Sequence, residues 1–227
     1  MSNQKKKNGG KKPKPKSKDA GSAPGTAGRL VALDGVHGAS LVVEAPRLAR
    51  LFPSEQHPAW SLFDASNTFH ELGMGKAKTL TPTPRTLILL YASDLLFRLR
   101  WEIEPTLKEG RTVVAAPYVE TAVAFGAAAG LPVEWLEELF SFAPKPAACF
   151  RLKEKKTSKK DKKPDRKNGI AEAPGFVEFC SASLAKNSPG WDAAEVRVSM
   201  IQHFKTLEEQ NRILKFGKKV PKAVLKG

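Results

Sequence analysis

Apolar and polar positions along the chain form blocks that predict strands and helices in alternation. Short apolar runs bounded by glycine or proline are typical of strands buried on both faces, and three such runs occur, at 29–35, 110–117 and 147–152. Longer segments have apolar residues at helical spacing; these are 44–52, 83–105, 118–130, 131–143, 176–185 and 192–214. Strands that alternate with helices predict an α/β fold, a three-layer sandwich with a mostly parallel sheet and right-handed crossovers.

Local signals refine the ends of these elements. Pro46 either kinks its helix or marks the first turn. Asp192 followed by Glu195 fits a capping box, and Gly217 fits the C-cap of the last helix. The segment 53–81 shows neither period and is predicted to be irregular, and no further strand is evident near the C-terminus.

Positive charge is concentrated in two short segments. The chain has 38 Lys and Arg against 23 Asp and Glu, a formal net charge of +15. Residues 1–18 hold eight lysines and no acid, and residues 151–168 hold ten basic residues against three acids. The rest of the chain holds 20 basic and 20 acidic residues. The sequence therefore predicts a neutral body that carries two basic appendages.

This charge pattern sets the expected domain organisation. Residues 1–28 are predicted to be a disordered Lys-rich tail, because they offer too little apolar surface to offset the entropy lost on ordering. Residues 29–227 are expected to form one α/β domain with a basic, flexible segment at 153–169. Two interpretations of the basic segments stay open. They are solvated appendages, or they contact nucleic acid non-specifically through 1–18 and 153–167, which would be salt-sensitive.

Cysteine and histidine spacing argues against a metal site or a disulfide framework. Cys149 and Cys180 are far apart, which indicates buried thiols in a reducing compartment. His57, His70 and His203 show no ligand spacing, so no metal is predicted. No apolar run approaches the roughly 20 residues that span a bilayer, and the N-terminus lacks the apolar region of a secretory signal. We expect a cytoplasmic protein without membrane contact.

The stretch LDGVHGASLV at 33–42 joins the first apolar run to a segment that could open a helix. A strand, a glycine turn and a helix together present backbone N–H groups to phosphate. Glycine spacing alone has low specificity for such a site, and the stretch has no lysine.

Residues 88–152 carry an ordered set of unlike features that resembles the central part of a thymidylate kinase. The features are an Asp on a helix, a proline and a glycine before a strand, a tyrosine after it, a GLPVEWL helix and a Lys-Pro pair; the residues are Asp94, Pro105, Gly110, Tyr118, 130–136, Lys145 and Pro146. Together with 29–52 the resemblance spans roughly half of the chain. It implies the P-loop NTPase-like fold of the nucleoside monophosphate kinases and a homodimer formed through helix packing. It also implies a nucleotide pocket whose equivalents here are Asp94, Leu95, Ala116, Pro117 and Tyr118.

The chain departs from that family at positions that handle phosphate. In place of the loop pattern G-x-x-x-x-G-K-[ST] the chain has a stretch that contains Gly35, His37, Gly38, Ala39, Ser40, Leu41 and Val42. Leucine therefore replaces the phosphate-binding lysine, and valine replaces the hydroxyl that binds magnesium. Ala116 and Pro117 replace the family's Asp-Arg pair at a strand end. Leu95 replaces the arginine after Asp94, and Ala129 replaces the arginine of a Gly-Arg-Gly turn. Because phosphoryl transfer depends on such charges, these changes predict a degenerate phosphate loop without catalytic residues.

Three functional hypotheses follow. The first is a catalytically impaired thymidylate kinase homologue that acts as a nucleotide-binding or scaffold protein, with itself or an intact kinase paralogue as partner. The second is an active dTMP kinase that converts ATP and dTMP to ADP and dTDP with unconventional site residues, and it alone requires ATP and magnesium. The third is a nucleic-acid-associated protein that uses the basic segments.

Several side chains have a functional and a structural interpretation. His37 touches a phosphate as a cation, or it is a turn residue without a chemical role. Tyr118 lines a nucleoside cleft, or it packs as an aromatic residue after a strand. Ser40 is predicted to cap the helix that follows it. Trp101 and Trp135 lie on apolar helical faces and are predicted to belong to the core or to an interface.

Overall fold

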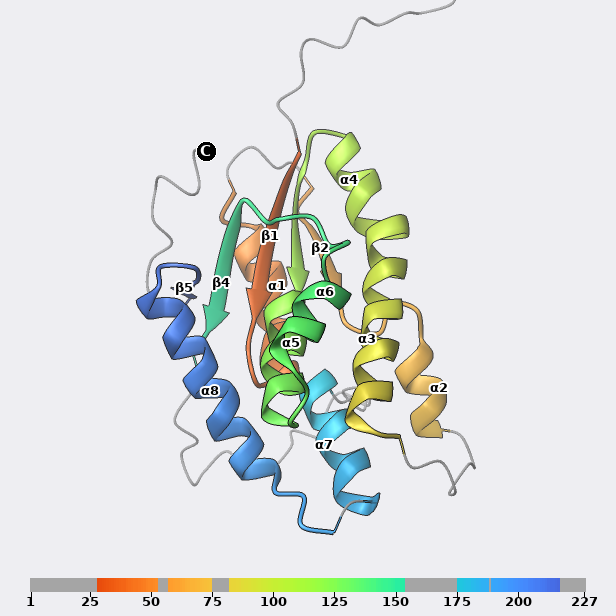
Figure 1. Cartoon of the computed structure of the whole chain (residues 1–227). Coiled ribbons are helices and arrows are strands. Elements are labelled where there is room, and N and C mark those ends of the chain that lie inside the picture. Colours follow the sequence, from red (N-terminus) through yellow and green to blue (C-terminus); the bar gives the residue numbers. More distant parts are fainter. Residues whose placement is uncertain (1–27, 53–56, 75–81, 154–174, 188, 217–227) are drawn as a thin grey trace, which may run out of the picture.

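The computed structural model describes residues 28–52, 57–74, 82–153, 175–187 and 189–216 (Figure 1). Its strands form one parallel sheet in the order β2-β3-β1-β4-β5. The strands are β1 (Arg29–Asp34), β2 (Ala59–Leu62), β3 (Thr112–Ala116), β4 (Ala148–Leu152) and β5 (Leu214–Phe216). The predicted α/β fold with a parallel sheet is confirmed.

Helices cover both faces of the sheet, and the alternation of side chains along β1 divides the core in two. Val31 and Leu33 point to one face, where α1 (Gly38–Ala49) packs behind the strands in Figure 1. Leu30 and Ala32 point to the other face and join the larger core cluster. That face carries α2 (Thr68–Met74), α3 (Pro84–Arg98), α5 (Val119–Ala128), α6 (Val133–Leu139), α7 (Phe176–Asn187) and α8 (Ala193–Glu209). The result is the predicted three-layer arrangement.

The helix predicted at 83–105 is present but interrupted. Helix α3 passes into a π-helical segment, η1 (Leu99–Ile103), and then into α4 (Glu104–Lys108). Pro105 lies in the first turn of α4, and proline has no N–H to continue the preceding hydrogen-bond ladder. Thr83 begins the run as an N-cap, accepting a hydrogen bond from the Thr86 amide at 3.2 Å.

The prediction that 53–81 is irregular was wrong for part of that segment. It contains β2 and α2. Strand β2 has only four residues and places a polar side chain, Ser61, in the interior, where it donates to Glu102 at 2.6 Å. The strand forms because it pairs with β3, and its own residues show no alternation of apolar and polar positions that would predict it.

The C-terminal region also differs from its prediction. Helix α8 ends at Glu209 rather than at 214, and β5 then pairs with β4, so the fifth strand judged not evident is present. A strand of three residues is too short to show a period of two. Asp192 is the N-cap of α8, as expected, and accepts from the amides of Ala194 and Glu195. Gly217, the predicted C-cap, lies outside the described residues, as do most of the predicted tail and most of 153–169.

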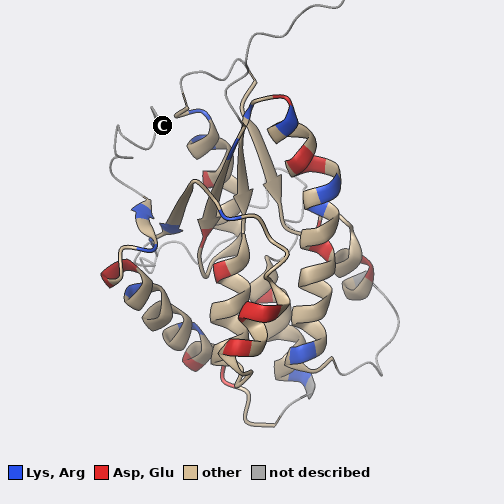
Figure 2. Ribbon diagram, turned by 45° about the horizontal axis from the view of Figure 1, so that its top comes forward, with Lys and Arg blue, Asp and Glu red and all other residues tan. Residues whose placement is uncertain are grey.

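Charged residues of the described body are of both signs. Figure 2 shows basic and acidic residues interspersed along the helices. Arg151, counted above with the second basic segment, is buried on β4 and pairs with Glu208 at 3.1 Å. Cys180 is buried and Cys149 is half-buried, and both are free thiols. Within the described ranges, no helix is long and apolar enough to cross a membrane.

Candidate functional site

The carboxyl ends of β1 and β3 border the candidate site. From β1 the chain proceeds through α1 to β2 on one side, whereas from β3 it proceeds to β4 on the other side. Ligands of open α/β sheets bind at such a switch of direction. A cavity of about 60 Å³ lies here, and its lining residues are Gly35, Gly38, Leu41, Val42, Phe63, Asp64, Ala116, Pro117, Thr121, Gly175, Phe176 and Val177.

The predicted phosphate-loop stretch is largely helical. Helix α1 begins at Gly38, six residues earlier than expected, with His37 as its N-cap residue and Pro46 inside it. Ser40 therefore lies in the first turn, and the prediction that it caps the helix was wrong. Leu41 is buried, whereas Val42 is about half exposed. Gly38 to Val42 thus form the start of a helix, and residues 35–37 connect it to β1.

The first amide of α1 is bonded to a carboxylate from a distant part of the chain. Gly38 N–H donates to both oxygens of Glu178, at 3.1 and 3.3 Å. His37 Nδ1 lies 3.8 Å from the same carboxylate, and Arg197 Nη2 lies 3.9 Å from it. Burial alone would raise the pKa of Glu178, but the nearby His37 ring, the backbone amides of Glu178 itself and Gly38, and the charge of Arg197 outweigh it, so the pKa is lowered.

Asp34, the last residue of β1, is completely buried beside this site. Its Oδ1 accepts three hydrogen bonds, from Tyr118 N at 2.9 Å, Thr121 N at 3.0 Å and Thr121 Oγ1 at 2.7 Å. Its Oδ2 has no hydrogen-bond partner among the described residues. Burial is the main reason that the pKa of Asp34 is raised to about 6, and the hydrogen bonds from Thr121 and Tyr118 limit the rise.

Asp94 on α3 has a different environment although it is equally buried. Its carboxylate accepts from Asp64 N at 3.1 Å and from Ser66 N and Oγ at 3.0 and 2.8 Å. Arg98, one helical turn further along, places Nε 3.3 Å from Oδ2. The Arg98 guanidinium also donates to Pro117 O at 2.8 Å. This group therefore ties α3 to the turn after β2 and to the end of β3.

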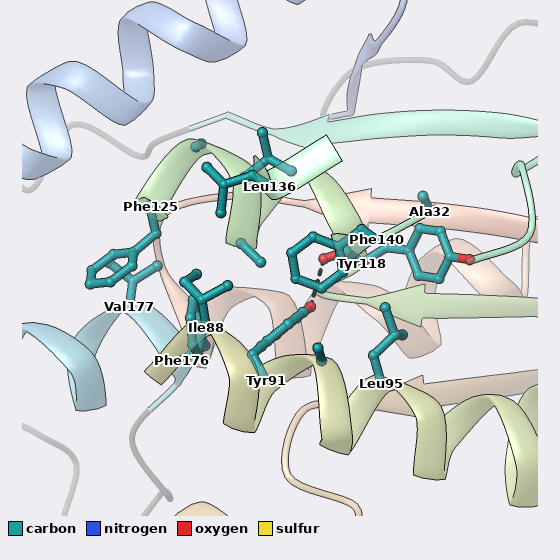
Figure 3. Packing of buried hydrophobic residues seen from close by; sticks show 14 of the residues in the cluster. Ala32, Ile88, Tyr91, Leu95, Tyr118, Phe125, Leu136, Phe140, Phe176 and Val177 are labelled. Carbon is teal, nitrogen blue, oxygen red and sulfur yellow. Dashed lines mark hydrogen bonds between the residues drawn. The ribbon is translucent and has the colours of Figure 1, made fainter. Parts of the chain in front are cut away.

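An aromatic cluster adjoins the cavity through Phe176, which is one of its lining residues, and Figure 3 shows part of this cluster. Phe176, at the start of α7, is 4.5 Å from Tyr91 and 5.4 Å from Phe125 between ring centroids. Tyr91 donates from its hydroxyl to Tyr118 O at 2.6 Å, the dashed line in Figure 3. Tyr118 itself is buried and donates to Pro144 O at 2.8 Å. It is absent from the residues that line the described cavity.

The chain is similar in sequence to thymidylate kinases from several microorganisms. It is 39% identical over 66 residues to a probable thymidylate kinase of Pyrobaculum calidifontis, which is 29% of this chain and 34% of that protein. It is 28% identical over 126 residues to probable thymidylate kinase 2 of Saccharolobus solfataricus, 56% of this chain and 59% of that protein. A thymidylate kinase of Desulfosudis oleivorans is 32% identical over 119 residues, 48% of this chain and 54% of that protein. This chain is a relative of the thymidylate kinases.

The similarity to these thymidylate kinases covers only part of each protein, which limits what can be inferred about this chain from them. The chain spans between a third and three fifths of the length of these three relatives. No protein-family model matches it. The relationship and the parallel α/β fold support the family resemblance deduced from the residues, and they leave the activity of this relative to be argued from its own side chains.

The residues at the loop do not fit a nucleoside triphosphate with magnesium. The Gly38 amide is bonded to Glu178, the Leu41 side chain offers no charge, and the Val42 side chain has no oxygen to bind a metal. Cavities that bind drug-sized ligands measure about 300–1,000 Å³, far above the cavity found here. Among the described residues, no group of three or more His, Cys, Asp and Glu side chains could hold a metal ion.

The structure brings together only part of the predicted set. Gly35, Gly38, Leu41, Val42, Ala116 and Pro117 line the cavity, whereas Asp94, Leu95 and Tyr118 are buried away from its lining. Ala39 and Ser40 lie in the first turn of α1, and His37 faces Glu178.

Sequence reasoning missed Thr121, Glu178, Phe176 and Arg98. The spacing of Asp94 and Arg98, four residues apart on a helix, was a signal for the last of these. For Glu178 there was none, because the residue it contacts is 140 positions away.

Proposed function

We propose that this thymidylate kinase relative is catalytically impaired and acts as a scaffold or dimerisation protein. One observation carries the proposal. The described residues that line the cavity include no lysine and no arginine, and their single charged side chain is the acid Asp64. A site of this composition has the wrong sign of charge for a phosphate group.

The chemistry explains why this matters. A transferred phosphoryl group spreads negative charge over its oxygens, and enzymes lower the barrier mainly by positioning it and stabilising that charge with cations. Removing one preorganised donor from an active site commonly costs a hundredfold or more in rate. Here lysine, hydroxyl and strand-end carboxylate are replaced together, by Leu41, Val42 and Ala116.

A face of α3 and η1 supports the scaffold role. Leu89, Leu96, Phe97 and Trp101 are exposed apolar side chains on this continuous helical run. In Figure 1 α3 lies towards the edge of the molecule, away from α8. The occupant that we propose is a second copy of the chain, because the same stripe on two copies can pack helix against helix in an isologous dimer. This agrees with the homodimer that the family resemblance implies.

Turnover and binding assays on the full-length protein test the proposal. The protein is incubated with ATP, magnesium and dTMP, and dTDP is measured beside an intact thymidylate kinase as positive control. We expect no dTDP above the background without protein. Calorimetric titration with dTMP, with and without ATP and magnesium, accompanies the assay. Measurable dTDP formation would overturn the impairment and favour the active dTMP kinase with unconventional residues.

The basic segments carry the other hypothesis. Residues 1–18 and nearly all of 153–167 lie outside the described residues, so non-specific nucleic-acid binding stays a prediction. Titration of labelled DNA at several salt concentrations tests it, with a variant lacking residues 1–28 as comparison. Binding that weakens steeply with salt and is reduced in the truncated variant would support this role.

A further inference from the structure

The start of α7 covers the end of α1 where an anion would bind. The N-terminus of a helix carries partial positive charge and unsatisfied N–H groups, which attract phosphate and carboxylate. Helix α1 has twelve residues, and its first amide is hydrogen-bonded to both oxygens of Glu178. A cationic arginine, Arg197, and the ring of His37 lie within 4 Å of the same carboxylate. An anion is therefore already held at this helix end, and it belongs to the chain itself.

Two glycines allow this close approach. The backbones of Gly38 and Gly175 are in contact, and a Cβ added to either residue would overlap the backbone of the other. Gly175 directly precedes α7, so the contact seats the start of α7 against the start of α1. Neither glycine has a positive φ, so the space they leave is the feature that the contact requires.

Phe176 anchors the same segment on its other side. Its side chain is 1% exposed and packs among Phe63, Tyr91 and Phe125, with ring centroids 5.6, 4.5 and 5.4 Å away. Burial of a phenylalanine side chain stabilises the position of the segment that carries it. Figure 3 shows this residue close to Ile88 of α3, and Phe176 is one of the residues that line the cavity. The segment is thus held by backbone contact, an aromatic anchor and a charged hydrogen bond.

We propose that residues 175–178 are a built-in plug of the cavity at the carboxyl ends of β1 and β3. In this plug the Glu178 carboxylate takes the place of a phosphate group on the first turn of α1. The plug keeps phosphate and phosphate monoesters out of the cavity while Glu178 is in place. This goes beyond the proposed scaffold role, because it concerns binding of an anion and is independent of whether the protein transfers phosphate.

Hydrogen–deuterium exchange of the segment 35–42 tests the plug in the full-length protein. The variants are Glu178→Gln, Glu178→Ala and Phe176→Ala, and Glu138→Gln is the matched control, since Glu138 is an exposed helical glutamate. We expect the exchange of 35–42 to accelerate about tenfold or more in the three variants, as expected when a local opening costs less free energy. The control is expected to match the parent protein. Unchanged exchange in Glu178→Gln and Glu178→Ala would overturn the proposal.

Inorganic phosphate then tests the substitution of carboxylate for phosphate. The exchange of segment 35–42 is measured in each protein at increasing phosphate concentration. Chloride at equal ionic strength is the reference. We expect saturable slowing in Glu178→Ala and no slowing in the parent protein. Equal slowing in both proteins, or none in Glu178→Ala, would overturn the proposal. Unfolding of each variant is followed in parallel by far-UV circular dichroism, so that loss of the fold is recognised. The dTDP assay above is unaffected by these outcomes, so the two proposals fail separately.

Discussion

Asp34 and Asp94 are both completely buried near the cavity, yet their carboxyl groups have different neighbours. Asp94 has Arg98 beside it and receives hydrogen bonds on both oxygens from the turn at 64–66. Asp34 receives its three hydrogen bonds on one oxygen, and among the described residues the other oxygen has no partner. The pKa of Asp34 is raised to about 6, chiefly by burial. One carboxylate is compensated by a cation, and the other is compensated by neutral donors alone.

The difference shows what surrounds each carboxylate in the described structure. Around Asp94 the polar groups form a network that joins α3, β2 and β3, and its loss would leave an unpaired buried charge. Around Asp34 the neighbouring cavity is lined mostly by apolar residues and glycines, and the carboxylate accepts hydrogen bonds from the start of α5. The network around Asp94 therefore connects α3 to the turn after β2 and to the end of β3. At the end of β1, by contrast, a buried carboxyl group with a raised pKa contacts neutral donors.

The largest effect is expected from Asp94→Ala. The substitution leaves Arg98 buried without its anion and releases the turn at 64–66, and breaking a buried pair in this way costs about 3–5 kcal/mol. Urea denaturation at pH 7 measures the loss. The double variant Asp94→Leu with Arg98→Met removes both charges and is expected to lose clearly less. Equal losses in the two proteins would show that the charge pair has no special role.

Asp34→Asn tests the pH dependence of stability that the buried Asp34 carboxyl group causes. The folded carboxyl holds its proton up to about pH 6, whereas the ordinary pKa is 3.8, so the folded state binds more protons between these values. Stability relative to Asp34→Asn is therefore expected to fall as pH rises from about 4 to about 6, by about 3 kcal/mol. Urea denaturation at several pH values measures it. A stability difference that does not change with pH would contradict the raised pKa.

Thr121→Val is expected to have an intermediate effect. Its hydroxyl donates to Asp34 Oδ1 and accepts from Gly35 N, and a buried group left without its partner costs about 1–3 kcal/mol. Because this hydrogen bond lowers the pKa of Asp34, its removal should raise that pKa further. Thermal and urea denaturation measure the loss, and Thr121→Ser is expected to recover most of it. A serine variant as unstable as the valine variant would point to packing instead.

The smallest change in monomer stability is expected from Trp101→Lys. This side chain is 66% exposed, and surface substitutions usually change stability by less than about 0.5 kcal/mol. The same substitution places charge in the proposed dimer contact and is expected to weaken self-association. Analytical ultracentrifugation of both proteins measures this, with Val198→Lys, an equally exposed apolar site on α8, as control. A parent protein that is monomeric at all concentrations would contradict the dimer contact.

The predictions from the sequence succeeded where a local pattern carries the information. The buried strands at 29–35, 110–117 and 147–152 are β1, β3 and β4, and the cap at Asp192 is present. The prediction failed at β2 and β5, because these short strands exist through pairing with β3 and β4. Trp101 was predicted to lie in the core or an interface, and its exposure excludes the core of the monomer. Trp135 is partly buried against the core.

The sequence by itself determined that the chain is an α/β protein related to thymidylate kinases, and it predicted that Leu41 and Val42 stand where phosphate chemistry needs lysine and a hydroxyl. Only the tertiary structure decided which distant groups contact this stretch. Gly38 and Glu178 are 140 positions apart, and Gly35 and Thr121 are 86 apart. Periodicity and capping depend on neighbours within a few residues, whereas contacts such as these depend on how the helices pack on the sheet.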